Sequence, residues 1–173
     1  MSQPFHQPVL AARLLELLPD ARRVVDGTLG DGGHAAQFLE RGAAVLGVDR
    51  DPEALERARS RLDSPALEVV AGSTYDDATI ARIAAFRPDL ILLDLGVSSR
   101  QLDDDQLGFT FRPGVPLDMR MSRRGPTAAD LLNEAAEAEI ARWLADFGDE
   151  RRARRMAAEI VRRRQRSPFR TSD

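Results

Sequence analysis

Two spacings of apolar residues alternate along the first part of the chain. Short apolar runs predict strands at residues 22–26, 44–49, 67–71 and 90–94. Between them, apolar residues recur every three or four positions and predict helices at residues 7–18, 34–41, 51–62 and 76–86. Strands that alternate with helices form βαβ units, so we expect an α/β fold around a parallel sheet.

The fourth predicted strand carries an unbroken apolar run from Leu90 to Leu93. Such a run is typical of a strand that is buried on both faces. Four strands connected in this way take the order 3-2-1-4, however, which places the fourth strand at an edge of the sheet. Because an apolar edge pairs readily with another chain, a homodimer formed through this strand is one expectation.

The regular alternation stops after Asp94. Residues 95–126 show little regular pattern, and a connection of that length is usually functional or marks a change of domain. Helical spacing returns at residues 127–133, 137–147 and 150–166. We therefore expect a Rossmann-like half at residues 1–105 and a helical part at residues 106–173.

The composition indicates a globular chain. Of its 173 residues, 43% are hydrophobic and 31% are charged, and no apolar run is long enough to span a membrane. The absence of cysteine excludes disulfides and thiolate metal sites, and it fits a reducing cytoplasm. Two isolated histidines do not make a metal site, so we expect no bound metal. Because no apolar run is long enough, we also expect no membrane partner.

Charge is distributed unevenly along the chain. Residues 1–118 contain 12 Arg against 19 Asp and Glu, a net of −7, and residues 119–173 contain 13 Arg against 9 acids, a net of +4. All basic residues are arginine, and nine of them fall within residues 151–170. A basic C-terminal part after an acidic N-terminal part predicts contact with nucleic acid, although a solvated helix face has the same charge pattern.

A glycine-rich turn follows the first predicted strand. Residues 30–35 read Gly-Asp-Gly-Gly-His-Ala, which fits the G-x-G-x-x-A pattern of dinucleotide-binding folds. Glycines let the backbone approach a ligand there, and the N-terminus of the next helix favours negative charge. Asp49 ends the second strand 19 residues after Gly30, where a carboxylate accepts hydrogen bonds from ribose hydroxyls.

Two further acids narrow the choice of ligand. Asp26 ends the first strand directly before the turn, where a carboxylate would repel a pyrophosphate and suit a cationic ligand. S-adenosylmethionine has a ribose, a cationic amino-acid end and no phosphate, so the pattern favours it over NAD(P). Asp94 follows the fourth strand, at the edge where such sheets bind ligands. The alternatives are an NAD(P)-dependent oxidoreductase and a turn whose glycines serve packing alone.

These segments and several others resemble the bacterial small-subunit (16S) rRNA cytosine-N4 methyltransferases, the RsmH/MraW family. The matching stretches are residues 6–10, 26–34, 49–52, 94–102, 108–111, 116–121 and 148–151. The sequences DLGVSS, from Asp94, and PLDMRM, from Pro116, are the most specific of them. Members of the family run well past the point where this chain stops, so the resemblance implies a C-terminally truncated chain with an incomplete sheet.

The resemblance implies a Rossmann-like, S-adenosylmethionine-dependent methyltransferase with a helical domain inserted after the fourth strand. Its substrate would be a cytosine in the decoding region of the small ribosomal subunit RNA, methylated at N4. The residues implied to contact S-adenosylmethionine are Gly32, Gly33, His34, Asp49, Asp94 and Gln101. Tyr75, or its neighbour Thr74, corresponds to the aromatic residue that flanks the adenine.

Asp94 is the candidate catalytic residue within this scheme. The exocyclic amine of cytosine is a poor nucleophile, and an acceptor of its N–H hydrogen bond localises the nitrogen lone pair. We expect Asp94 to be that acceptor, with Ser98 or Ser99 assisting and with Asp118 and Arg120 lining the same cleft. The arginines expected to hold the RNA are Arg100, Arg112, Arg120, Arg123, Arg124 and those of the helix at residues 150–166. A non-catalytic RNA-binding fragment is the alternative for so short a chain.

Overall fold

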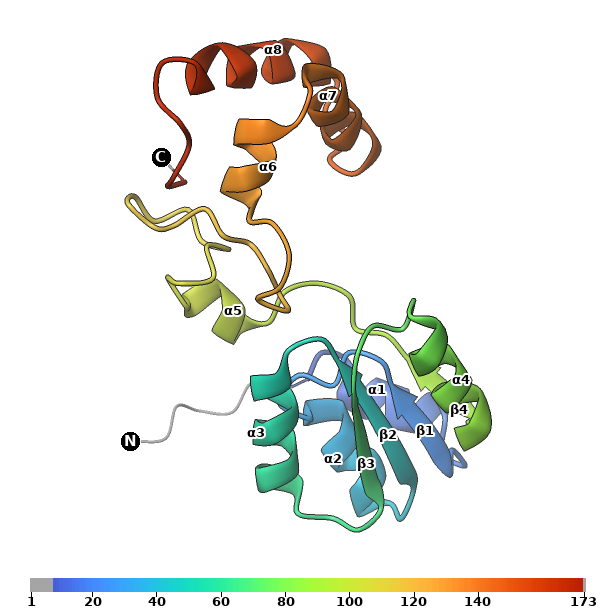
Figure 1. Cartoon of the computed structure of the whole chain (residues 1–173). Coiled ribbons are helices and arrows are strands. Elements are labelled where there is room, and N and C mark those ends of the chain that lie inside the picture. Colours follow the sequence, from blue (N-terminus) through green and yellow to red (C-terminus); the bar gives the residue numbers. More distant parts are fainter. Residues whose placement is uncertain (1–7, 173) are drawn as a thin grey trace. The chain divides into compact units, whose positions relative to one another are not determined.

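The computed structural model describes residues 8–172 and divides into two compact units between Gly96 and Val97 (Figure 1). The sequence predicted this division after residue 105. Residues 97–105 belong instead with the second unit. They lead into Leu107, which is buried and whose carbonyl accepts a hydrogen bond from the N–H of Met119 at 2.8 Å.

Four parallel strands form the sheet of the first unit: β1 (Arg23–Asp26), β2 (Ala44–Asp49), β3 (Leu67–Ala71) and β4 (Leu90–Leu92). Their order is β3-β2-β1-β4, which confirms the predicted order and the α/β fold class. Val25 of β1 pairs with Leu46 on one side and with Ile91 on the other. Because all the strands run in one direction, the acids that follow β1, β2 and β4 meet at the same edge.

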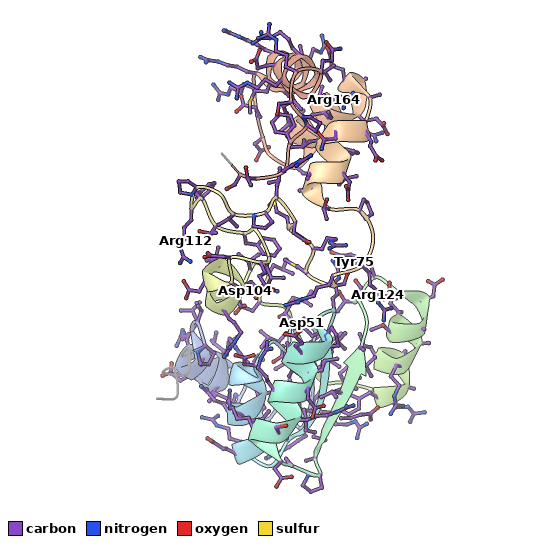
Figure 2. All side chains as sticks on the ribbon, turned by 60° about the vertical axis from the view of Figure 1, so that its left-hand side comes forward. Asp51, Tyr75, Asp104, Arg112, Arg124 and Arg164 are labelled. Atoms are coloured by element: carbon purple, nitrogen blue, oxygen red, sulfur yellow. The ribbon has the colours of Figure 1, made fainter. Side chains whose placement is uncertain are left out.

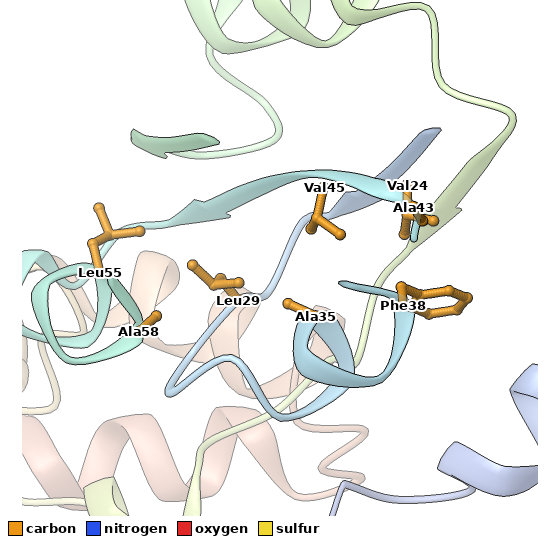
Figure 3. Close-up of a cluster of buried hydrophobic side chains, with 8 residues drawn as sticks. All are labelled: Val24, Leu29, Ala35, Phe38, Ala43, Val45, Leu55 and Ala58. Carbon is orange, nitrogen blue, oxygen red and sulfur yellow. The ribbon is translucent and has the colours of Figure 1, made fainter. Parts of the chain in front are cut away.

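Helices cover both faces of this sheet. Helices α2 (Gly33–Glu40) and α3 (Pro52–Leu62) pack on one face, and α4 (Asp77–Phe86) packs on the other. The larger core, shown in Figure 3, consists of Val24, Leu29, Ala35, Phe38, Ala43, Val45, Leu55 and Ala58. Leu29 belongs to the glycine turn, so the same core that holds the sheet also fixes the turn.

Strand β4 is shorter and more exposed than the sequence predicted. It was expected through Asp94, with the pattern of a buried strand, but it ends at Leu92 and leaves 53% of Ile91 exposed. The reason is its place at the edge: within the described residues it pairs with β1 alone. The carboxylate of Asp89 fixes the start of this pairing, because it accepts hydrogen bonds from the N–H groups of Arg22 and Arg23 at 2.9 and 3.0 Å.

The N-terminal helix is also shorter than predicted. Helix α1 spans Ala11–Leu17, whereas the apolar spacing predicted residues 7–18. Leu10 has a left-handed backbone with φ 54°, which stops the right-handed helix from extending back toward Val9. Of the motif at residues 6–10, His6 and Gln7 lie outside the described residues.

The second unit is helical. Its elements are α5 (Ser99–Asp103), α6 (Ala128–Glu134), α7 (Glu137–Asp146) and α8 (Ala153–Arg164). Ile140 of α7 is buried together with Ala153 and Ala157 of α8. The end of the described chain returns to this unit, where the N–H of Leu117 donates to the carbonyl of Arg170 at 2.9 Å. None of the helices within residues 8–172 has the length and apolarity that a membrane crossing requires.

Helix α5 lies inside the segment that the sequence predicted to be irregular. A capping box begins it: Ser98 Oγ accepts from the N–H of Gln101 at 3.2 Å, and Gln101 Oε1 accepts from the N–H of Ser98 at 2.8 Å. The helix has only five residues, too few for a helical spacing of apolar positions to become visible.

Candidate cofactor site at the carboxyl ends of the strands

The glycine turn joins β1 to α2 at the carboxyl edge of the sheet, as the sequence predicted. The N–H of Gly27 donates to the carbonyl of Leu92 at 2.9 Å, and the N–H of Leu29 donates to the carbonyl of Val48 at 3.0 Å. The N–H of Gly32 then closes the turn on the carbonyl of Leu29 at 2.8 Å. The turn is therefore bonded to the strands on both sides of β1.

Two glycines of the turn are required by their surroundings. Gly32 has φ 78°, and a Cβ added there would lie 2.7 Å from Cδ1 of Leu62 in α3. A Cβ added at Gly27 would lie 2.5 Å from Cδ2 of Leu93 and 2.9 Å from Cγ2 of Thr74. A side chain at either position would require these neighbouring side chains or the turn itself to move.

Asp49 uses both carboxylate oxygens to organise the backbone around it. Its Oδ2 accepts from the N–H of Gly30 at 2.7 Å, and its Oδ1 accepts from the N–H of Asp51 at 2.9 Å. The first bond ties the turn to the end of β2, and the second shapes the start of α3. Since a carboxylate offers about four lone-pair positions, each oxygen retains capacity for a ribose hydroxyl, the role predicted for this residue.

Asp26 is a buried acid at the end of β1. It is 2% exposed, and its Oδ1 accepts a long hydrogen bond of 3.3 Å from the N–H of Thr28. Burial raises the pKa of Asp26 to about 7, and the negative charges of Asp49 and Asp94 act in the same direction. The sequence predicted the acid at this place but not its burial, which depends on residues distant in the chain.

Asp94 follows β4 and lies next to this group. Its N–H donates to Oγ1 of Thr28 at 2.8 Å, so the turn also holds the start of the DLGVSS segment. Within residues 8–172 its carboxylate has no hydrogen-bond partner. The three acids do not form a metal-binding cluster in the part of the chain that the structure describes.

His34 lies in the first turn of α2, directly after Gly33, and is buried. Its Nε2 is 3.1 Å from the carbonyl oxygen of Val9, which requires Nε2 to carry the proton and donate. Burial lowers the pKa of His34, and the charge of Asp94 acts in the opposite direction. One ring nitrogen is thus engaged by the segment before α1, a contact that sequence spacing does not reveal. Contact of His34 with a cofactor stays a prediction.

The structure separates the two candidates for the adenine-flanking residue. Thr74 packs its methyl group against Gly27 at the end of β1. Tyr75, labelled in Figure 2, is 78% exposed in the loop between β3 and α4. Thr74 is therefore the one that contacts the turn, whereas Tyr75 has a ring face available for stacking. The place of either residue beside an adenine stays a prediction.

Gln101 belongs to the second unit. Its side chain completes the capping box of α5 by accepting from the N–H of Ser98. The other predicted cofactor residues, Gly32, Gly33, His34, Asp49, Tyr75 and Asp94, belong to the first unit. The contribution of Gln101 to the site stays a prediction.

Two arginines of α3 hold the turn from outside, and no sequence pattern predicted this role. Nε of Arg57 donates to Oδ1 of Asp31 at 2.7 Å, and Arg57 also lies 3.6 Å from the carboxylate of Asp51. Nη1 of Arg61 donates to the carbonyl of Asp31 at 2.7 Å. The two residues are four apart and share one face of the helix, but nothing local in the sequence indicates their contact with Asp31.

Most of the loop arginines predicted to bind RNA are paired inside the second unit. Arg112 lies 2.6 Å from Asp105, and Arg123 lies 3.8 Å from Asp104. Arg120 makes two hydrogen bonds to the carboxylate of Asp118, at 2.7 and 2.9 Å, which lower the pKa of that acid. Asp118 and Arg120 therefore neutralise each other.

Comparison with known proteins identifies relatives over nearly the whole chain. The model of the MraW methylase family matches residues 3–173. The ribosomal RNA small subunit methyltransferase H of Gemmatimonas aurantiaca is 49% identical over 98% of this chain and 55% of its own length. That of Deinococcus radiodurans is 46% identical over 96% of this chain and 54% of its own length. The chain spans about half the length of the curated relatives it matches.

Two solved structures overlap with the chain at low similarity. The methyltransferase domain of bacterial-CtHen1-C has a TM-score of 0.38 and 16% identity, over 65% of this chain and 59% of that one. NSun6 from Pyrococcus horikoshii with SFG has a TM-score of 0.37 and 21% identity, over 88% of this chain and 32% of that one. The family match rests on the sequence and extends from residue 3 to the last residue given. The chain belongs to the MraW methylase family.

Proposed function

We propose that the first unit binds S-adenosylmethionine at the glycine turn. The observation that carries this proposal is the gathering of Asp26, Asp49 and Asp94 at one edge of the sheet. Burial is the main cause of the raised pKa of Asp26, and the charges of the other two acids raise that pKa further. A ligand with a net positive charge relieves the repulsion among these acids, whereas the diphosphate of NAD would add to it. The acids thus favour a sulfonium cofactor.

The residues at the turn fit the parts of this cofactor. Asp49 has acceptor capacity for the ribose hydroxyls beside Gly30, and the negative charge of Asp26 and Asp94 favours a cationic amino-acid group. Gly27 and Gly32 let the turn pack closely against Leu93, Thr74 and Leu62, which fixes its backbone beside these acids. His34 and Gln101 complete the proposed set, with Tyr75 or Thr74 beside the adenine.

For the whole protein we propose N4-methylation of a cytosine in the 16S rRNA, in the decoding region. Family membership and the names of the relatives support a small-subunit rRNA methyltransferase. S-adenosylmethionine supplies an activated sulfonium methyl group. Asp94 accepts a hydrogen bond from the exocyclic N–H of the cytosine, raises the nucleophilicity of N4 and takes up the proton that N4 releases when it is methylated. An exposed carboxylate beside the turn, without a hydrogen-bond partner in the described chain, supports this role.

The first test is the thermal melt of the purified chain with S-adenosylmethionine, and with NAD as the control ligand. We expect S-adenosylmethionine alone to raise the melting temperature, because a ligand present at 100 times its Kd adds about 2.7 kcal/mol to the free energy of unfolding. A melting temperature that rises with NAD, or that changes with neither ligand, contradicts the proposed cofactor.

Methyl transfer to 16S rRNA tests the role of Asp94. We expect Asp94→Asn to lower the transfer rate by about a hundredfold or more, the usual contribution of a positioned acid–base group. Asp20→Asn, a change of the same charge at an exposed position before β1, should leave the rate unaltered. Full activity of Asp94→Asn removes this residue from the mechanism. A chain that binds the cofactor and RNA but transfers no methyl group supports the non-catalytic alternative.

A further inference from the structure

A groove lined by arginines lies between α7 and α8 of the second unit. It has a volume of about 1020 Å³. The arginines that line it are Arg142, Arg151, Arg152, Arg154 and Arg155. Two acids, Glu137 and Glu150, share the lining, so five positive charges face two negative ones. The groove therefore has a net charge of +3 and attracts anions.

The groove arginines differ from the other arginines of α8. Nε of Arg162 and Nε of Arg163 donate to Glu159 at 2.8 and 2.9 Å, and these bonds lower the pKa of Glu159 to about 2. Arg164, labelled in Figure 2, donates to the carbonyls at the end of α6, those of Leu132 and Ala135. Three of the basic residues of this helix are thus used within the unit itself.

The five groove arginines are exposed, and their guanidinium groups have no ion pair or hydrogen bond to any residue within 8–172. Each keeps five N–H donors, in the planar arrangement that binds phosphate oxygens in pairs. Four of them lie at the start of α8 and one lies in α7, so the groove is lined by donors from both helices. An anion with several charged groups along its length satisfies such an arrangement.

The rest of the lining excludes other kinds of ligand. Apart from the charged residues, the groove is lined by alanines, with no aromatic and no large apolar side chain. Small-molecule pockets are lined mainly by apolar and aromatic groups, and protein interfaces rely on large buried anchors. The groove offers no aromatic face on which bases could stack, so its guanidinium groups favour phosphates as their main contacts.

We propose that the groove between α7 and α8 binds the sugar-phosphate backbone of RNA without regard to base sequence. This inference rests on the proposed function, because it names the surface by which the second unit holds the RNA substrate. Contacts to phosphates fix the position of a nucleic acid on a protein, while other groups select the base. The groove would thus orient the RNA strand, and the choice of the target cytosine would be made elsewhere.

The test compares two double variants of the complete chain that remove the same charge from the same helix. Arg154→Gln with Arg155→Gln alters the groove, and Arg162→Gln with Arg163→Gln alters the arginines that are paired with Glu159. Binding of a fluorescently labelled oligouridylate is measured by anisotropy at several salt concentrations. A labelled RNA of mixed sequence and equal length serves as the second probe.

We expect the groove variant to bind both RNAs roughly tenfold more weakly than the unaltered chain. The plot of log K against log salt should become less steep by about 1.4, because each of the two lost phosphate contacts contributes about 0.7 to its slope. The matched variant should change affinity less than about threefold. Equal losses in the two variants overturn the proposal, because they show that net charge and not the groove determines binding. Binding of polyglutamate in preference to RNA overturns it in favour of an acidic protein partner.

The proposed function has a separate readout in the same samples. The melting shift caused by S-adenosylmethionine depends on the first unit, which neither double variant alters. If the groove variant keeps the melting shift with S-adenosylmethionine and binds RNA as tightly as the unaltered chain, the proposed role of the groove is refuted and the proposed cofactor is not. A chain that shows no shift refutes the proposed cofactor, whatever the RNA result. Equal melting temperatures of the variants without ligand show that both are folded.

Discussion

Asp26 connects stability with ligand binding at the scale of a single residue. The turn places its carboxyl group among apolar neighbours and two other acids, where the charged form is unfavourable. A raised pKa in the folded chain means that the folded state binds the proton more tightly than the unfolded state does. The contribution of Asp26 to stability is therefore greatest below the ordinary pKa of 3.8 and falls as the pH rises to about 7.

The first prediction concerns Asp26→Asn, which removes this charge but keeps the shape. The shift from 3.8 to about 7 corresponds to roughly 4 kcal/mol at most, because each pKa unit is worth about 1.4 kcal/mol. We expect the variant to be more stable than the unaltered chain by roughly 2–4 kcal/mol above pH 7 and equally stable near pH 4. Urea unfolding across this pH range measures the difference, and a difference that does not vary with pH would contradict it.

The same variant should lose cofactor affinity while it gains stability. A cationic ligand favours ionised Asp26, so the affinity of the unaltered chain for S-adenosylmethionine should increase between pH 6 and pH 8. In Asp26→Asn this pH dependence should disappear. Titration calorimetry at these two pH values provides the measurement, and a persistent pH dependence in the variant would assign it to another group.

Gly32 gives the second prediction, with Gly42 as a matched control. Both have left-handed backbones, with φ 78° and 80°, but a Cβ at Gly42 meets nothing within 4 Å, whereas one at Gly32 meets Leu62. Gly42→Ala should therefore cost about 1–2 kcal/mol from backbone strain alone. Gly32→Ala should cost a further 1–3 kcal/mol from overpacking and should weaken cofactor binding. Similar free energies of unfolding in the two variants would show that the contact with Leu62 relaxes freely.

At the scale of elements, α3 acts as a support for the glycine turn. Arg57 binds the side chain of Asp31, and Arg61 binds its carbonyl, so one helix face holds the outer side of the turn. Arg57→Ala should weaken the binding of S-adenosylmethionine several-fold, with a loss of stability of about 1 kcal/mol or less for this partly exposed pair. Arg59→Ala on the same helix is the control, because this side chain has no hydrogen-bond or ion-pair partner within residues 8–172. Equal cofactor affinity in the two variants would show that the turn keeps its shape without Arg57.

Strand β4 supports the predicted self-association. It is an edge strand with one paired side in the described chain, and the side chain of Ile91 is half exposed. Ile91→Lys should therefore weaken association of the chain with itself at least several-fold in sedimentation measurements. Ile80→Lys, an equal change at a half-exposed position of α4, should have little effect. If both variants associate like the unaltered chain, β4 is not the contact.

The helices and strands also show which parts of the fold the sequence patterns could predict. The order of the four strands follows from βαβ connections and was predictable, as were the positions of α2, α3 and α4. The end of β4 was not, because it depends on the number of residues that β1 offers for pairing. Helix α5 is defined by the side chains of Ser98 and Gln101 rather than by apolar spacing. Likewise, the burial of Asp26 and the bond of His34 to Val9 arise from contacts distant in sequence.

At the scale of the whole molecule, the two units carry opposite charge. Residues 1–96 contain 10 Arg and 15 acids, a net of −5, and residues 97–173 contain 15 Arg and 13 acids, a net of +2. The acidic unit contains the turn proposed for a cationic cofactor, and the basic unit contains the groove proposed for RNA. Since each unit has a buried core of its own, the two ligands should act on separate parts of the chain.

Hydrogen exchange tests this division and the predicted role of Gln101 together. Saturating S-adenosylmethionine should slow exchange at residues 26–34 and 49–51, by up to about a hundredfold at 100 times its Kd. The labelled oligouridylate should slow exchange at residues 142–155 instead. If Gln101 contacts the cofactor, α5 will be protected by S-adenosylmethionine although it belongs to the second unit. Protection confined to the first unit would remove Gln101 from the site, and protection of α7 and α8 by the cofactor alone would contradict the independence of the two units.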